Sequence, residues 1–180
     1  MQVSGIDFQQ NFFVLFGLPI RYQLDQTLLN QHYHTLQAQV HPDKFSHLSE
    51  AERRVSMQWA TRVNEAYQTL RNPIKRARYV LSLHSIDTQE ETNTAMPADF
   101  LMQQMEWREA IAEAQQEGDV SLLTELETRM QHEVHELESQ LAAKIDGEKN
   151  YRAAAAEVRK LKFLEKLMEE IAAAFDEIEN

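Results

Sequence analysis

A short polar stretch with a helix-length segment on each side constrains the fold of this chain more than any other part of the sequence. The stretch covers residues 40–45 and reads Val-His-Pro-Asp-Lys-Phe. Pro42 fixes its own φ angle and disfavours helical backbone at His41, so a helix that reaches this point must end there. Two long helices joined by a short connection pack as an antiparallel hairpin. The sequence therefore predicts a helical hairpin with His41, Pro42 and Asp43 in an exposed turn, where functional residues are often found.

Both segments that flank this turn carry helix signals. Asp25 is the predicted N-cap of the first helix, and Ser49 with Glu52 forms a capping-box pattern for the second. Apolar residues recur in both helices at three- and four-residue spacing. They are Leu28, Leu29, Tyr33, Leu36 and Val40 in the first helix, and Val55, Trp59, Val63, Ala66 and Leu70 in the second. We expect Trp59 and Tyr67 in the core rather than in a ligand site.

Shorter helices are predicted before and after the hairpin. Asn11 can cap a helix over 12–16, which Gly17 and Pro19 terminate, and its aromatic side chains are expected in the core. Pro73 closes the second long helix, and a further helix follows over 74–83. We expect these two helices to brace the hairpin, so that residues 1–84 form one domain.

The second half of the chain predicts a separate bundle of three helices. Residues 85–96 are polar and without periodicity, which indicates a linker. Three amphipathic segments follow, over 97–117, 119–145 and 150–178. Their connections at Gly118 and Gly147 are short, which favours antiparallel neighbours. Residues 97–180 are therefore the predicted second domain, and the scarcity of Gly and Pro, four of each, supports an all-α chain.

Charge is unevenly divided between the two halves. Residues 1–84 contain nine Lys and Arg against six Asp and Glu, whereas residues 85–180 contain nine against 23. The acidic half should repel nucleic acid, so we expect no nucleic-acid partner. The absence of Cys excludes disulfides and thiolate metal sites. The longest apolar run, 12–20, is too short to span a membrane, and no secretory signal is visible, so we expect a cytoplasmic chain without cofactor or membrane partner.

The order of the first four helices resembles the J domain of co-chaperones. His41-Pro42-Asp43 lies near the end of the second helix, as in that domain. Further matching residues are Asn64-Glu65-Ala66-Tyr67-Gln68-Thr69-Leu70 and Pro73-x-x-Arg76-x-x-Tyr79. Beyond the J domain, the chain is similar to HscB, the J-type co-chaperone family of iron–sulfur cluster assembly. The similar segments are Phe13-Val14-Leu15-Phe16-Gly17-Leu18-Pro19, Leu81-Ser82-Leu83-His84, Phe100-Leu101-Met102 and Arg159-Lys160-Leu161-Lys162-Phe163-Leu164.

This resemblance implies two protein partners. It implies that the J domain, through His41, Pro42, Asp43 and Lys44, contacts an HscA-type heat-shock chaperone and accelerates its ATP hydrolysis. It also implies that the bundle holds an IscU-type scaffold protein on which clusters are built. One feature departs from the pattern, because J domains usually carry Lys and Arg on the helix before the tripeptide, and here residues 23–42 contain neither. This departure predicts weaker electrostatic steering and a lower salt dependence of chaperone binding than in a more basic relative.

The helix that starts at Pro97 has a second face that indicates a binding surface on geometry alone. At about 100° per residue, its core stripe contains Phe100, Trp107, Ile111 and Ala114. The opposite side gathers three apolar residues and three carboxylates: Leu101, Met102, Met105, Glu106, Glu109 and Glu113. Apolar contact would supply affinity, and the carboxylates would select a basic partner. Phe163, at the edge of the last helix's apolar stripe, is expected to extend this surface.

Three other interpretations of the sequence stay open. His41 and Asp43 could form the acid–base pair of a helical hydrolase, although no nucleophile or oxyanion loop accompanies them, and we expect no enzyme. His132 and His135 have near-ligand spacing, but a solvated helix face explains them without a metal, and we expect no metal site. The alternative to the family function is a general J-domain co-chaperone with a different client or a dimerising bundle.

Overall fold

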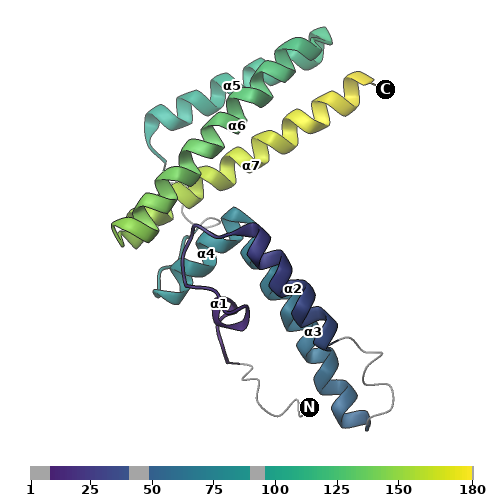
Figure 1. Cartoon of the computed structure of the whole chain (residues 1–180). Helices are drawn as coiled ribbons and strands as arrows, with labels where there is room; N and C mark the ends of the chain where they lie inside the picture. The colour runs from purple at the N-terminus through teal and green to yellow at the C-terminus, as the bar shows by residue number, and fades with distance from the viewer. Residues whose placement is uncertain (1–8, 41–48, 90–95, 180) are drawn as a thin grey trace. The chain divides into compact units, whose positions relative to one another are not determined.

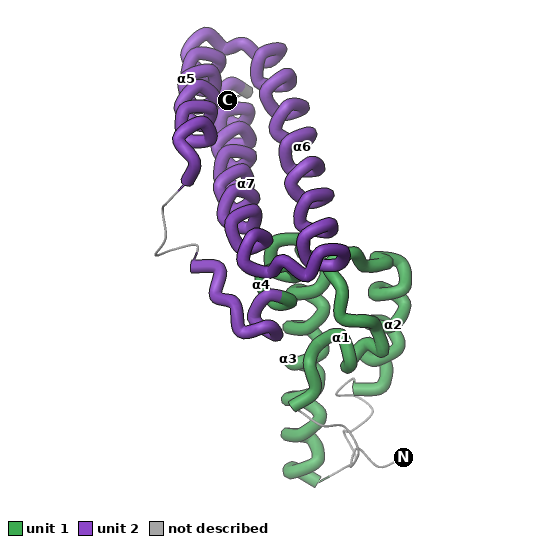
Figure 2. Tube along the Cα trace, turned by 90° about the vertical axis from the view of Figure 1, so that its left-hand side faces the viewer, with its two compact units in different colours: residues 1–80 green, residues 81–180 purple. Residues whose placement is uncertain are grey.

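The structure is a computed structural model that describes residues 9–40, 49–89 and 96–179 (Figure 1). These residues form helices and irregular segments without a strand, so the predicted all-α class is confirmed. The predicted turn residues His41, Pro42, Asp43 and Lys44 lie outside the described residues. The chain divides into two compact units, residues 1–80 and 81–180, which are coloured separately in Figure 2 and are described one at a time below. The predicted domain limits stay a prediction.

The described part of the first unit contains three helices and most of a fourth. They are α1 (Phe12–Leu15), α2 (Gln26–Val40), α3 (Glu50–Arg71) and α4 (Pro73–Leu83). The predicted caps are confirmed: Asn11 Oδ1 accepts a hydrogen bond from the Val14 amide at 3.0 Å, and Asp25 Oδ1 from the Leu28 amide at 3.0 Å. Ser49 and Glu52 form the complete capping box of α3. The first three helices therefore begin where a short polar side chain accepts a hydrogen bond from one of the free backbone amides.

Side-chain pairs show that α2 and α3 form an antiparallel hairpin. The Tyr33 hydroxyl donates to Asn64 Oδ1 at 2.9 Å, and the Tyr67 hydroxyl donates to Asn30 Oδ1 at 2.9 Å. Residue numbers rise along one helix as they fall along the other, which is the pattern of antiparallel neighbours. The rings of Tyr33 and Tyr67 stack between these bonds with their centroids 3.9 Å apart. Tyr67 is thus half-buried between the two helices of the hairpin, which lie side by side in Figure 1.

The predicted core stripe of α3 is largely confirmed, with one error at its start. Trp59, Val63, Ala66 and Leu70 are buried, as predicted. Val55 is exposed, and Ser56 is buried in its place because residues 56, 59, 63, 66 and 70 follow the three-four alternation without interruption. The Ser56 hydroxyl donates to the Val40 carbonyl oxygen at 3.0 Å, which satisfies a free carbonyl at the end of α2. Leu28 is also exposed, because Leu29 lies on the buried side of α2.

The second unit is a three-helix bundle, as predicted. Its helices are α5 (Ala98–Glu117), α6 (Val120–Ala142) and α7 (Tyr151–Glu179), and a π-helical turn, η2 (Ala143–Gly147), extends α6. Gly118 ends α5 in left-handed backbone at φ +67°, and the Asp119 side chain caps α6 by accepting from the Leu122 amide at 2.9 Å. Side-chain hydrogen bonds between α5 and α7 join residues that are 62 positions apart in the sequence, both for Arg108 with Glu170 and for Gln115 with Glu177. These two helices are therefore parallel neighbours, with α6 antiparallel to both (Figure 1).

The segment after α4 packs on α7 within the second unit. The His84 and Tyr151 rings stack with their centroids 3.8 Å apart. Arg159 Nη1 donates to the Thr88 carbonyl oxygen at 3.1 Å, and Thr88 is buried. The first residues of the predicted linker are therefore held against the bundle by specific contacts, which their polar and aperiodic sequence did not indicate.

Candidate binding site on the helical bundle

Helix α5 has one buried face and one exposed apolar face. Trp107, Ile111 and Ala114 are buried against the bundle, as the spacing predicts. Leu101, Met102 and Met105 on the other side are 43%, 64% and 64% exposed. Because large apolar side chains normally bury most of their surface, three together on one helix face form an unusual surface feature. We call Leu101, Met102 and Met105 the exposed α5 face.

Three carboxylates accompany the exposed α5 face. Glu106, Glu109 and Glu113 are all exposed, and none of them forms an ion pair within the described parts of the chain. Their negative charge is therefore uncompensated at the surface. An apolar patch beside free carboxylates is suited to a partner that presents apolar and basic residues together.

Phe163 lies at the contact between α7 and α5, where it is only half-buried. Its ring meets the ring of Phe100 edge-on, with centroids 6.2 Å apart. The Arg108 guanidinium lies 4.8 Å from the centre of the Phe163 ring and pairs with both carboxylate oxygens of Glu170 at 3.2 Å. Arg108 therefore covers part of Phe163, a role that the sequence did not indicate because Glu170 is 62 residues away. The extension of the binding surface by Phe163 stays a prediction.

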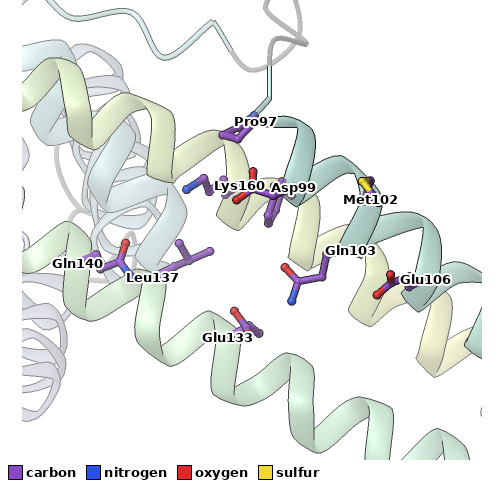
Figure 3. Close-up of a pocket in the computed structure, with 10 residues that line it drawn as sticks. Pro97, Asp99, Met102, Gln103, Glu106, Glu133, Leu137, Gln140 and Lys160 are labelled. Carbon is purple, nitrogen blue, oxygen red and sulfur yellow. The ribbon is translucent and has the colours of Figure 1, made fainter.

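A cleft of 590 Å³ opens between α5 and α6 (Figure 3). Its lining includes the carboxylates of Asp99, Glu106 and Glu133. Apolar walls come from Pro97, Phe100, Met102 and Leu137, and amides from Gln103 and Gln140. Two of these residues, Met102 and Glu106, also belong to the predicted surface. The cleft therefore adjoins the exposed α5 face, and the sequence alone could not reveal it because its two walls come from different helices.

A buried ion-pair network lies beside this cleft. Glu157 on α7 is 6% exposed and pairs with Lys144 of η2 and, at 3.1 Å, with Lys160. Burial by itself raises the pKa of the Glu157 carboxyl, but the bonds from Lys144 and Lys160 outweigh it and hold that pKa below its usual value. The Lys160 ammonium also lies 5.8 Å from the centre of the Phe100 ring on α5. The network thus links η2, α7 and α5 around one charged residue.

In the first unit, arginines that could form a basic docking surface are partly used for internal contacts. Arg76 is buried and donates to the carbonyl oxygens of Tyr22 at 2.7 Å and Leu70 at 2.6 Å. Arg62 Nη2 donates to the Gln10 carbonyl oxygen at 2.9 Å. Arg53 and Arg54, at the start of α3, are exposed. Arg54 also pairs with Glu50 at 4.0 Å, and Arg71 is exposed at the opposite end of α3, so exposed arginines lie at both ends of this helix.

Helix α2 presents a neutral surface in place of a basic one. It contains no Lys or Arg between Gln26 and Val40. His32 is half-buried, and its Nδ1 donates to the Phe16 carbonyl oxygen at 2.5 Å, which fixes the ring orientation. Helix α2 therefore has no Lys or Arg with which to form a basic face, and its exposed polar groups are mainly amides.

The described residues offer no grouping of three His, Cys, Asp or Glu side chains that could hold a metal ion. His132 and His135 are both exposed on α6. Across the same residues, no helix combines the length and apolar character needed to cross a membrane.

Comparisons with known proteins agree with the two-unit architecture. Residues 96–172 match the model of the HSCB C-terminal oligomerisation domain. The chain is 51% identical to the "Co-chaperone protein HscB homolog" of Aromatoleum aromaticum, over 97% of this chain and 99% of that protein. Among solved structures, "Chaperone HscB from Vibrio cholerae" is 36% identical with a TM-score of 0.82, covering 94% and 99% of the two chains. Human co-chaperone protein HscB is 29% identical with a TM-score of 0.87, covering 93% and 83%.

Proposed function

The chain belongs to the HscB family of co-chaperones, and from this premise we propose that it stimulates the ATPase of an HscA-type heat-shock chaperone and delivers an IscU-type iron–sulfur scaffold protein to it. As a co-chaperone it is not an enzyme. Its contribution is to bind two proteins and to favour the hydrolysis-competent conformation of one of them. We place this activity in the cytoplasm.

The exposed α5 face is the observation that carries the scaffold half of this proposal. Leu101, Met102 and Met105 are directed away from the bundle core, so the bundle does not need them for its own packing. Burying them under a partner would supply apolar binding energy, and Glu106, Glu109 and Glu113 would favour a basic contact surface on the scaffold. Phe163 would join this surface through the part of its ring that Arg108 leaves uncovered.

The chaperone half of the proposal rests on the hairpin. His41, Pro42, Asp43 and Lys44 would dock on the chaperone, with Asp43 as a carboxylate that can pair with an arginine. The capping box at Ser49 and the bond from Ser56 to the Val40 carbonyl hold the two helix ends that flank this turn. Since α2 lacks Lys and Arg, binding would depend less on salt than in a J domain with a basic second helix.

The ATPase of the chaperone provides the direct test. Asp43→Asn is expected to abolish stimulation, because it removes the charge while it keeps nearly the same shape, and to leave the circular dichroism spectrum and the melting temperature unchanged. Asp25→Asn is the matched control, since asparagine also caps helices and Asp25 is remote from the turn in sequence. Full stimulation by the Asp43 variant would refute the docking role.

The match to a family of oligomerisation domains supports a second candidate, in which the bundle joins copies of this chain. In that case the exposed α5 face would be buried between two copies rather than under a scaffold. Sedimentation of the purified chain with and without the scaffold separates the two candidates. A stable dimer that Met105→Glu dissociates, with no scaffold binding, would favour the oligomeric alternative.

A further inference from the structure

The cleft between α5 and α6 retains negative charge that its own lining does not neutralise (Figure 3). Asp99, Glu106 and Glu133 all line it, and none of them is in an ion pair within the described ranges of the chain. Lys160 contributes a positive charge, but this ammonium is already paired with Glu157 at 3.1 Å. The charge of the three carboxylates is therefore available to a ligand.

The cleft is also amphipathic in a way that suits a long basic side chain. Gln103 extends from α5 and Glu133 from α6, and the two point toward one another across the gap (Figure 3). Neither of these two side chains has a hydrogen-bond partner within the described residues. Leu137 points into the same space (Figure 3), and Phe100 also lines the cleft. An arginine would place its aliphatic stem against these apolar groups and its five N–H donors between the carboxylate and the amide oxygen.

We propose that this cleft receives an arginine from a basic segment of the same protein partner that covers the exposed α5 face. This inference rests on the proposed function and specifies how the partner is recognised. Met102 and Glu106 are shared between the cleft and the surface beside it, so one partner would contact both without a gap. The volume of 590 Å³ lies within the range of about 300–1,000 Å³ that is typical of ligand sites, and it admits neighbouring residues of the segment as well.

Glu133 provides the sharpest test because it lines the cleft but lies on α6, away from the exposed α5 face. Glu133→Gln is expected to weaken binding of an IscU-type scaffold about fivefold to tenfold in a calorimetric titration of the full-length chain. Glu136→Gln removes the same charge from the same helix at an exposed position outside the lining, and is expected to stay within about twofold of the unmodified chain. Unchanged binding by the Glu133 variant would overturn the proposal.

A second measurement does not depend on the scaffold. N-acetyl-arginine amide, titrated into the ¹⁵N-labelled chain, is expected to shift the side-chain amide resonances of Gln103, while the neutral N-acetyl-citrulline amide leaves them in place. Glu133→Gln should abolish the shift. If the scaffold fails to bind but the arginine shift is present, the proposed function is wrong and the chemistry of the cleft is supported.

Two other outcomes would refute the proposed arginine site without refuting the proposed function. If Met105→Ala weakens scaffold binding while Glu133→Gln and N-acetyl-arginine amide have no effect, the proposed function stands and the cleft has no part in it. If Glu133→Gln instead dissociates a dimer of this chain in sedimentation, the occupant is a second copy, and the proposed arginine of a different protein is refuted.

Discussion

Met105 offers a quantitative test of the exposed α5 face. Its side chain is 64% exposed, so a partner that covers it would remove about two-thirds of its surface from water. Complete burial of a Met side chain stabilises a complex by about 1.5–3 kcal/mol, so covering this fraction contributes about 1–2 kcal/mol. Met105→Ala is therefore expected to weaken scaffold binding by a factor of roughly 5 to 30.

The same substitution should have little effect on folding. Because Met105 is largely exposed and alanine favours helix at least as strongly as methionine, the free energy of unfolding should change by less than about 0.5 kcal/mol. Isothermal titration with the scaffold and urea denaturation of the free chain measure the two quantities. Val120→Ala is the control, since Val120 is 48% exposed at the start of α6 and outside the surface. If the Met105→Ala variant binds the scaffold with an affinity within twofold of the unmodified chain, the exposed α5 face is not the scaffold-binding surface. An equal loss of affinity in the Val120→Ala variant would refute the assignment as well.

Two further predictions concern buried charges. Glu157→Gln should destabilise the bundle by about 2 kcal/mol at pH 7, less than for a fully buried pair because the Lys144 and Lys160 side chains keep 23% exposure. The native pKa of Glu157 is lowered, so its stabilising effect is present above the unfolded pKa and is lost as pH falls through the native pKa. In urea denaturation at decreasing pH, the difference in unfolding free energy between the unmodified chain and the Glu157→Gln variant should therefore narrow below about pH 4. Arg76→Ala should cost about 3 kcal/mol of unfolding free energy, because it leaves the carbonyl oxygens of Tyr22 and Leu70 without their donors. Lys75→Ala, exposed on the same helix, should change stability by less than about 0.5 kcal/mol, and equal effects of the two substitutions would contradict the internal role of Arg76.

The exposed α5 face was predictable from the sequence because it depends on one helix alone. A rotation of about 100° per residue separates Leu101 and Met105 from Trp107 whatever the rest of the chain does. The same local rule predicted the buried positions of α3 from Trp59 onward. It failed at Ser56, because a serine was not expected in an apolar stripe and its hydroxyl partner, the Val40 carbonyl, belongs to another helix.

The surroundings of Phe163 and the cleft were not predictable in this way. Arg108 covers the Phe163 ring because α5 and α7 are parallel neighbours, and Glu170 orients its guanidinium from 62 residues away. Glu133 lines the cleft only because α6 packs beside α5. Periodicity identifies which side of a helix is apolar, but it does not say which residues of another helix will meet it.

By itself, the sequence determined the helices, their caps and the class of protein. Asn11, Asp25, Ser49 and Asp119 satisfy amide groups within three residues of themselves, and Gly118 adopts left-handed backbone at its own position, so these boundaries follow from local chemistry. Only the tertiary structure decided that Lys144 and Lys160 neutralise a buried Glu157, while the carboxylates of the cleft have no ion-pair partner among the described residues. The reason is physical: whether a charge is compensated depends on groups within a few ångströms in space, and those groups lie on helices far apart in the chain.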